Sequence, residues 1–482
     1  MDCNFRRDNM PLNTRTKILA TLGPMSNSDE KIAELIDAGV DGFRLNFSHG
    51  THEQHKKMYE KIRRISKEKK AYVAVVADLQ GPKLRIGDFK NDKVTLKKGQ
   101  KFTFDMKKDL GDENRVCLPH KEIFEALKVG DKLLVNDGNI ILKVKSVKKT
   151  SAVTEVEVGG VVSSHKGVNL PNSSLNISPL TDKDLKDLDF ALEIGVDCVC
   201  LSFVQRLSDV KEARKIIGKK AWIISKLEKP QALDELDQII KASDMIMVAR
   251  GDLGVECPVV TVPLLQKKIV AKCRQYAKPV IVATQMLESM ISAPIPTRAE
   301  VSDVANAVYD GCDVVMLSAE TATGDYPVET VKTMRGVIET IEKDDRYFES
   351  VNRFKEELCC KNESHVITHA ASEAVKVMDK ITVITTFSVS GATTLSMAQE
   401  RSKLPIIAIT PSDEIACRLS LVWGVKSNVD KKVFAGFDNV EAVAREVAHK
   451  HKVAEHGDFI MLTAGYPFGK VGLTNVLHII KA

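Results

Sequence analysis

A lysine and a glutamate stand two positions apart in the segment WIISKLEKP, as Lys226 and Glu228. The apolar, β-branched run before them predicts a strand, and residues two apart on a strand share a face. An ammonium group beside a carboxylate suits a site where negative charge develops and a metal ion is held. A structural ion pair is the alternative, and this motif alone leaves it open.

A second carboxylate, Asp252, follows the next apolar run in MVARGDLGVECP. Together with Glu228 it would supply the oxygen ligands that Mg²⁺ prefers. The backbone N–H groups of Gly251 and Asp252 would suit an anion, since no side chain stands in the way at the glycine. The alternative is an ordinary turn between a strand and a helix. A further segment, FRLNFSHGTHEQH, offers Arg44 as a clamp for a phosphate group.

Eight short apolar runs, most of them followed by a helical pattern, predict a closed parallel barrel that would position these groups. Each run ends in polar or charged residues, and barrel enzymes place their catalytic groups at that rim. A doubly wound open sheet is the alternative. The runs cover residues 16–23, 42–50, 72–81, 197–204, 221–228, 244–252, 278–285 and 313–320.

A long interval between the third and fourth runs has a different pattern. It is rich in lysine and alternates with period two, as in antiparallel hairpins. We interpret it as a β-rich domain inserted after the third strand, able to close over the rim as a lid. After about residue 355 a smaller α/β pattern begins, with the charged stretch EKDDRYFESVNRFKEE as the connection.

The expected fold is therefore α/β: an eight-stranded (β/α) barrel with an inserted β-barrel-like lid domain and a C-terminal α/β domain. The chain has 482 residues, which is too long for one core. The expected division is 1–80 and 177–352 for the barrel, 81–176 for the lid and 353–482 for the C-terminal domain.

Composition excludes several classes of protein. A net charge of +5 over this length is too small to indicate a nucleic-acid-binding protein. No apolar run approaches the ~20 residues that span a membrane, and the first thirteen residues lack a signal-peptide core. The ten cysteines include no C-x-x-C pair, and several lie inside apolar runs. These features favour a reduced, cytoplasmic location.

Several long motifs resemble those of the pyruvate kinase family, and the resemblance covers nearly the whole chain. It implies transfer of the phosphoryl group of phosphoenolpyruvate to ADP, which gives pyruvate and ATP, with Mg²⁺ or Mn²⁺ as cofactor. The motifs are RLNFSHG, DLQGPKLRIG, HKGVNLP, IISKLEKPQAL, MVARGDLGVE, PVIVATQMLESM, PTRAEVSDVANAV and MLSAETATGDYP.

The resemblance also implies roles for individual residues. Lys226 resembles the cation that neutralises the migrating phosphoryl group, and Glu228 and Asp252 resemble the divalent-metal ligands. Thr284 lies where the enolate is protonated. The phosphoenolpyruvate contacts are Arg44, Gly251, Asp252 and Thr284. The nucleotide-side residues are Asn46, Phe47, Ser48, His49, Arg85 and Lys166. For His49 the alternative is a structural loop histidine.

The chain departs from the family at a monovalent-ion site. Many members bind K⁺ at positions matching Asn46, Ser48, Asp78 and the next residue, here Leu79, which can offer only its carbonyl group. K⁺-requiring members carry a glutamate where this chain has Lys83. Because an ammonium group resembles K⁺ in charge, our hypothesis is that Lys83 replaces the ion and that K⁺ is not required. A solvated surface lysine is the alternative.

The C-terminal unit carries FSVSGATTLS after a predicted strand. Its hydroxyl groups and glycine suit a phosphate nest at a helix start, formed by Ser388, Ser390, Gly391, Thr393 and Thr394. Helix capping by Ser388 or Ser390 is the alternative. The resemblance places sugar-phosphate effectors in this region, and it also implies a homotetramer.

Two other functions remain open at this stage. A different barrel enzyme of phosphoenolpyruvate or pyruvate chemistry, such as a lyase or aldolase, would lack the lid and the basic residues Arg85 and Lys166. A non-catalytic sensor on the same scaffold would have no need to keep Lys226, Glu228 and Asp252.

Overall fold

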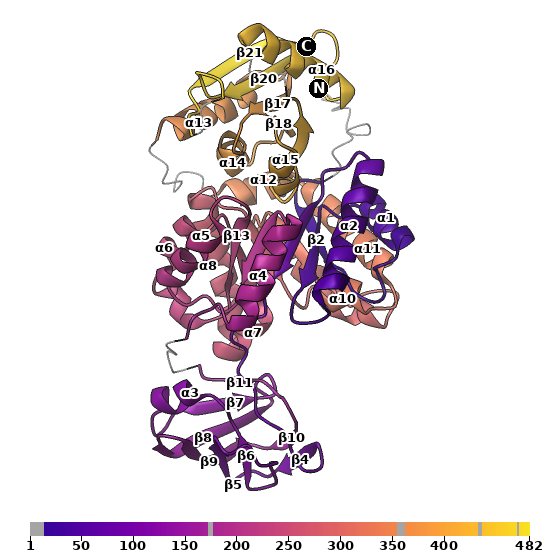
Figure 1. Ribbon diagram of the computed structural model, residues 1–482. Helices are drawn as coiled ribbons and strands as arrows, with labels where there is room; N and C mark the ends of the chain where they lie inside the picture. Colours follow the sequence, from indigo (N-terminus) through magenta and orange to yellow (C-terminus); the bar gives the residue numbers. More distant parts are fainter. Residues whose placement is uncertain (1–13, 172–176, 354–361, 432–435, 470–471) are drawn as a thin grey trace.

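Eight parallel strands close into a barrel in the computed structural model, which describes residues 14–171, 177–353, 362–431, 436–469 and 472–482 (Figure 1). Each strand lies within one of the eight predicted runs, so the closed barrel is confirmed and the open sheet is wrong. In the order in which they pair around the barrel, the strands are β1 (Lys17–Thr21), β16 (Val314–Leu317), β15 (Val280–Ala283), β14 (Met245–Ala249), β13 (Trp222–Leu227), β12 (Cys198–Leu201), β3 (Ala74–Asp78) and β2 (Gly42–Asn46).

Barrel strands are apolar on both faces because both faces are buried. On β1, Ile18 and Ala20 pack outward with the surrounding helices, while Leu19 belongs to the cluster that fills the barrel. Most polar groups of the strands therefore lie at or near their ends, although Ser225 is buried within β13. The surrounding helices are α1 (Asp29–Ala38), α2 (His52–Glu68), α4 (Asp182–Ile194), α5 (Leu207–Ile217), α6 (Leu236–Ala242), α7 (Arg250–Glu256), α8 (Val262–Gln275), α9 (Arg298–Tyr309), α10 (Ala319–Ala322) and α11 (Pro327–Glu342).

Local capping explains where several of these helices begin and end. The Ser28 hydroxyl accepts a hydrogen bond from the Lys31 N–H at the start of α1, and Gly39 ends the helix with a φ of 109° that favours glycine. At α5 the N-cap residue is Arg206, and Ser208 lies inside the first turn.

The inserted domain lies between β3 and β12, as expected. Six strands form one sheet, in the order β11, β7, β8, β9, β5 and β6, and β10 pairs with β4. The predicted hairpins are antiparallel, but β5 and β6 pair in parallel. The elements are β4 (Lys93–Leu96), β5 (Lys101–Asp105), β6 (Arg115–Cys117), α3 (Lys121–Ala126), β7 (Lys132–Val135), β8 (Ile140–Lys148), β9 (Ser151–Val158), β10 (Gly160–Ser163) and β11 (Val168–Asn169).

The C-terminal domain is a five-stranded sheet in the order β19, β18, β17, β20 and β21, parallel except for the edge strand β21. The apolar runs KITVITTF, LPIIAIT and DFIMLTAG predict β17, β18 and β20, whereas β19 and β21 were missed. Helix α12 (Asp345–Asn352) packs into the core of the barrel and precedes this domain. The elements of the C-terminal domain are α13 (Glu363–Val377), β17 (Ile381–Phe387), α14 (Ala392–Gln399), β18 (Ile406–Thr410), α15 (Asp413–Leu419), β19 (Val425–Val429), α16 (Phe437–Lys450), β20 (Phe459–Ala464) and β21 (Val476–Lys481).

The C-terminal domain packs against the amino ends of the barrel strands. One buried cluster joins barrel-interior side chains such as Leu19 with C-terminal side chains such as Leu421. The Arg401 guanidinium lies 3.1 Å from the carboxylate of Asp313, just before β16, and the Lys17 Nζ donates to the Val425 carbonyl group at 2.8 Å. The carboxyl ends of the strands are therefore left to face the inserted domain, at the opposite end of the barrel (Figure 1).

Some expectations lie partly or wholly outside the described residues. The lead-in 1–13 is one, and the domain limits near residues 176 and 353 border undescribed segments. Among the described helices, none is long and apolar enough to cross a membrane. The seven cysteines that the structure describes form no disulfide, and burial raises the pKa of the Cys198 and Cys200 thiols well above the usual value.

His451, directly after α16, predicts an acid-dependent loss of stability. Burial, with the nearby Lys426 and Lys450, lowers its pKa to about 4, and its buried Nε2 has no hydrogen-bond partner among the described residues. In the unfolded chain this histidine takes up a proton near its ordinary pKa of about 6.5. The contribution of neutral His451 to the free energy of unfolding is therefore fully present above that pH and is lost as the pH falls toward 4.

We expect about 1 kcal/mol to be lost between pH 7.5 and pH 5, allowing for the partial exposure of the ring. Denaturant midpoints of the wild type and His451→Gln at both pH values measure this. His449→Gln, in the last turn of the same helix but exposed, is the control. An equal pH dependence in all three proteins would contradict the prediction.

Candidate active site

Lys226 lies at the centre of a buried charge network at the carboxyl end of the barrel. Its Nζ is 2.8 Å from Glu228 Oε1 and 3.5 Å from Asp78 Oδ1, and it donates to the Ser202 hydroxyl at 2.9 Å. The predicted common orientation of Lys226 and Glu228 is thus confirmed. Burial lowers the pKa of Lys226, but the carboxylates of Asp78 and Glu228 outweigh it, and the pKa is raised overall. The ammonium form is therefore the stable one.

Arg44 joins the same network from β2. Its Nε donates to Asp78 Oδ2 at 2.6 Å, and its Nη1 donates to the Thr21 hydroxyl at 3.1 Å. Burial alone would raise the pKa of Asp78. The positive charges of Lys226 and Arg44 outweigh burial, so the pKa of Asp78 is lowered overall. One buried carboxylate thus holds two cations side by side at the rim, an arrangement suited to an anion with several negative charges.

Glu228 and Asp252 fit a divalent cation. Glu228 is fully buried; its Oε2 accepts the Phe203 N–H at 2.7 Å, and its Oε1 lies 2.8 Å from the Lys226 ammonium. Burial raises the pKa of Glu228, Lys226 opposes this, and the negative charge of Asp252 adds to it. Two neighbouring carboxylates whose negative charges repel are the kind of donor set that a hard dication stabilises.

The segment after β14 begins α7 at once and presents Gly251 to Thr284. The Gly251 N–H donates to the Thr284 hydroxyl at 2.8 Å, and that hydroxyl donates to the Ala283 carbonyl group at 2.7 Å. A side chain at Gly251 would press against the same hydroxyl, at 3.3 Å. Thr284 has a φ of 73°, which is strained for a β-branched residue and typical of functional sites. The Gly251 N–H is therefore occupied by Thr284 here.

Arg250 points away from the network. Its Nη1 lies 2.7 Å from Asp303 Oδ1 on α9, and its Nη2 donates to the Thr284 carbonyl group at 2.6 Å. It thus fixes the Thr284 backbone rather than facing Lys226.

A pocket between the barrel rim and the inserted domain adds residues that sequence reasoning missed. Asn169 on β11 donates to Glu256 Oε1 at 2.7 Å, and Lys229 pairs with the same carboxylate, so the inserted domain is fastened to α7. Lys229, Asn169 and Glu256 all lie in motifs quoted above, but no local pattern indicates that they contact one another. The pocket is lined by Pro82, Lys83, Leu84, Asp137, Gly167, Val168, Asn169, Ile177, Phe203, Gln205, Lys229 and Asp252.

The nucleotide-side residues are spread over two domains. Ser48 and His49 are exposed at the rim, but the Phe47 side chain is buried and stacks on His55, so only its backbone could meet a ligand. Arg85 donates to the His165 carbonyl group at 2.9 Å within the inserted domain. Among the described residues, no hydrogen bond or ion pair joins Arg85 or Lys166 to the β2 segment.

The monovalent-ion residues are partly engaged with other groups. Asp78 already pairs with Arg44 and Lys226, and the Leu79 carbonyl group accepts the Ser202 hydroxyl at 2.7 Å. Lys83 is exposed, and in the described parts of the chain its ammonium pairs with no carboxylate. It does line the same pocket as Asp252.

The C-terminal loop lines a second pocket. Gly391 (φ 87°) is the N-cap residue of α14 and no side chain caps this helix, so the capping alternative for Ser388 and Ser390 is wrong. Thr394 turns inward and its hydroxyl bonds that of Thr386 at 2.7 Å. The pocket is lined by Phe387, Ser388, Val389, Ser390, Ala392, Thr393, Gly465, Gly469, Gly472 and Leu473.

A barrel rim that holds a partly buried lysine and arginine beside two carboxylates defines a metal-assisted enzyme acting on an anionic substrate. Family models described as "Pyruvate kinase, barrel domain" and "Pyruvate kinase, alpha/beta domain" match residues 13–331 and 365–480. The chain belongs to the pyruvate kinase family and is a phosphotransferase. This membership implies dependence on a divalent metal.

Individual relatives agree with this assignment over nearly the whole chain. A pyruvate kinase of Agrobacterium vitis is 46% identical, covering 97% of both chains. One from Methylorubrum extorquens is also 46% identical and covers 98% of both. The crystal structure of a pyruvate kinase from Cryptosporidium parvum has a TM-score of 0.92 and 33% identity, covering 97% of this chain and 96% of its own.

Proposed function

We propose that this enzyme transfers the phosphoryl group of phosphoenolpyruvate to ADP, giving pyruvate and ATP in glycolysis. The observation that carries the proposal is the position of the Lys226 ammonium at the rim, between Asp78 and Glu228. Arg44 pairs with the other oxygen of the Asp78 carboxylate. Phosphoryl transfer depends mainly on alignment and on positive charge around the migrating group.

Each group then has a specific task. Arg44 and Lys226 hold the phosphate of the substrate and offset its repulsion from ADP. Glu228 and Asp252 would hold the divalent cation, Mg²⁺ or Mn²⁺, which would neutralise charge on the transferred group. Thr284 contacts the enolate side of the substrate, where its hydroxyl group can orient a proton donor. Asn46, Ser48, His49, Arg85 and Lys166 lie on the nucleotide side.

A coupled assay with phosphoenolpyruvate, ADP and Mg²⁺ tests the reaction. We expect pyruvate formation that requires ADP and stops when the metal is chelated. Pyruvate or another product formed without ADP would instead support a lyase or aldolase. No turnover in a folded, metal-loaded protein would refute the proposal and favour a sensor.

We also propose that the enzyme does not require K⁺ because Lys83 supplies the positive charge. Lys83 is exposed in the pocket shared with Asp252, and its ammonium group pairs with no carboxylate that the structure describes. We expect wild-type activity to be the same in tetramethylammonium and in K⁺ buffers. In Lys83→Glu, activity without K⁺ should fall by about 10²-fold and be restored by K⁺.

Lys98→Glu, an exposed lysine of the inserted domain, is the matched control and should stay independent of K⁺. A strict K⁺ requirement in the wild type would rule out the substitution of the ion by Lys83.

A sugar-phosphate effector site in the C-terminal domain is a further part of the proposal. Ser388, Ser390 and Thr393 border a pocket at the start of α14, where no side chain caps the helix N–H groups. A phosphorylated sugar should lower the half-saturating phosphoenolpyruvate concentration by about fivefold or more. Ser390→Asp should remove this response by charge repulsion, whereas Ser412→Asp, at the cap of α15, should keep it. A flat response across phosphorylated sugars would contradict the site.

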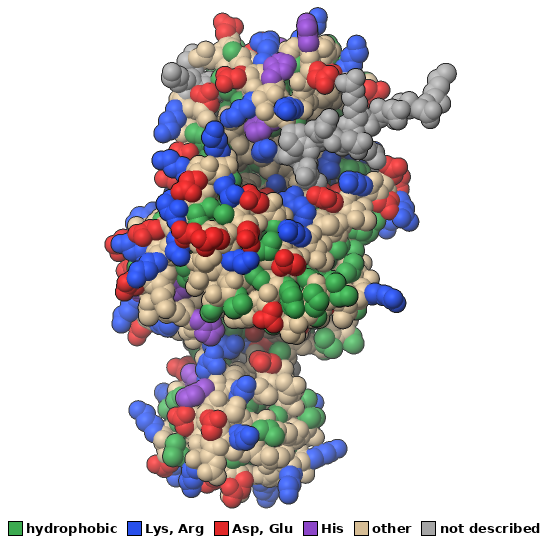
Figure 2. Space-filling model, turned by 90° about the vertical axis from the view of Figure 1, so that its right-hand side faces the viewer, with side chains coloured by type: hydrophobic (Ala, Val, Ile, Leu, Met, Phe, Trp, Pro, Cys, Tyr) green, Lys and Arg blue, Asp and Glu red, His purple; other side chains and the backbone are tan. Residues whose placement is uncertain are grey.

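A homotetramer in the cytoplasm completes the proposal, with the four-segment domain division given above. Exposed apolar side chains on the barrel support self-association: Val259, Val260, Leu264 and Ile295 are 71–82% exposed. Hydrophobic side chains also gather on the barrel face seen in Figure 2. Light scattering should give four times the chain mass of 53.2 kDa.

A further inference from the structure

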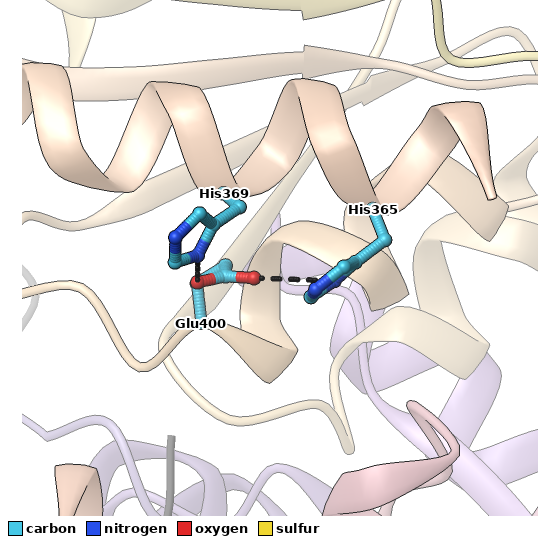
Figure 3. Close-up of side chains that lie close together, drawn as sticks. All are labelled: His365, His369 and Glu400. Carbon is cyan, nitrogen blue, oxygen red and sulfur yellow. Dashed lines mark hydrogen bonds and ion pairs between the residues drawn. The ribbon is translucent and has the colours of Figure 1, made fainter. Parts of the chain in front are cut away.

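Three potential metal ligands lie together in the C-terminal domain, far from the barrel rim. His365 and His369 belong to α13, and Glu400 directly follows α14. Figure 3 shows both imidazole rings projecting from α13 toward the Glu400 carboxylate. Residues four apart share one face of a helix, so α13 alone presents the two rings as a pair.

The distances suit a small ion. His365 Nδ1 lies 3.5 Å from Glu400 Oε1, and His369 Nδ1 lies 3.3 Å from Oε2. One ligand atom from each residue lies within 4.8 Å of the other two. A tetrahedral Zn²⁺ ion with bonds of about 2.0–2.1 Å spaces its ligand atoms about 3.3 Å apart. The three side chains therefore need only small rotations to close on an ion.

The surroundings hold the ligands in place. The Asn362 side chain accepts the His365 N–H at 2.9 Å and fixes the first turn of α13. Glu400 is 1% exposed, and the next residue, Arg401, is anchored to Asp313 of the barrel. The His369 side chain is 48% exposed and leaves the cluster accessible from solvent.

We propose that His365, His369 and Glu400 bind a divalent transition-metal ion of the Zn²⁺ type, with a fourth position open to water. Two imidazole nitrogens and one carboxylate match this class, whereas Mg²⁺ prefers oxygen ligands such as those at the rim. The bound ion ties α13 to the junction between the C-terminal domain and the barrel.

The full-length protein, stripped with a chelator and kept in saturating Mg²⁺, is titrated with Zn²⁺ and with Co²⁺. The wild type should bind one equivalent per chain at this cluster and gain thermal stability. His365→Asn and His369→Asn should each weaken binding at least about tenfold and lose the gain in Tm. Activity with Mg²⁺ should be unchanged, since the cluster lies away from the rim, so this test is independent of the proposed reaction.

His478→Asn is the matched control. Its Nδ1 lies 3.4 Å from Glu441 Oε1 and its side chain is 46% exposed, but it belongs to no group of three ligands in the described chain. It should bind the ion as the wild type does. Equal binding by His369→Asn and His478→Asn would overturn the proposal. So would a wild type that binds no ion while His369→Asn lowers the Tm in chelator, because the cluster would then be an ion pair only.

Discussion

Replacing Lys226 by methionine is expected to lower kcat by about 10³-fold, because the variant loses the one full positive charge placed between Asp78 and Glu228. The chain should still fold. Arg44 continues to neutralise Asp78, and burial and Asp252 raise the pKa of Glu228, so this carboxyl group can take up a proton. Steady-state kinetics and circular dichroism measure the two effects separately.

Lys17→Met is the matched control for this variant. Lys17 is also a buried lysine on a barrel strand, 3.7 Å from the carboxylate of Asp41, but it lies at the opposite end of the barrel. Lys17→Met should show how much the loss of a buried lysine lowers stability, while its kcat stays near that of the wild type. Near-normal turnover in Lys226→Met would remove Lys226 from the mechanism, and an equal loss of kcat in both variants would show a folding defect.

Replacing Glu228 by glutamine is expected to raise the half-saturating Mg²⁺ or Mn²⁺ concentration by about 100-fold or more, with a matching fall in kcat/KM. Glutamine keeps the shape and can still accept the Phe203 N–H, but it carries no charge for the cation. Mn²⁺ binding followed by electron paramagnetic resonance, together with metal-activation kinetics, provides the measurement.

Glu320→Gln provides the comparison. Glu320 is also a buried glutamate at the barrel rim, and burial raises its pKa, but its oxygens accept the Ser318 and Leu287 N–H groups. Its loss should leave metal affinity nearly unchanged. Unchanged affinity in Glu228→Gln would exclude Glu228 as a metal ligand, even if activity fell.

The eight strands and their polar ends could be predicted because they are local properties. A strand buried on both faces must be apolar throughout, so a lysine and a glutamate at its end stand out. The spacing of Lys226 and Glu228 then fixes their shared face. Asp252, at the end of the next strand, was placed in the same metal site from its residue type and position, and the family resemblance implied the same role.

The sequence-based predictions were wrong or incomplete where a local pattern is compatible with more than one structure. The serines in FSVSGATTLS are good capping residues, yet Gly391 is the N-cap residue of α14. Strands β19 and β21 were missed because their burial depends on neighbours far away in sequence. Phe47 was grouped with nucleotide-side residues by its motif, but its ring packs on His55 inside the barrel wall.

The sequence by itself determined the barrel, the inserted domain and the residue types at the rim. Only the tertiary structure decided that one carboxylate, Asp78, holds both Arg44 and Lys226, that Arg250 turns toward Asp303, and that Glu400 meets the histidines of α13. The reason is physical. The periodicity of apolar residues and the polar residues at strand ends are encoded within a few neighbouring positions. Distances between charged groups depend instead on how separate elements align when the barrel closes and the domains dock.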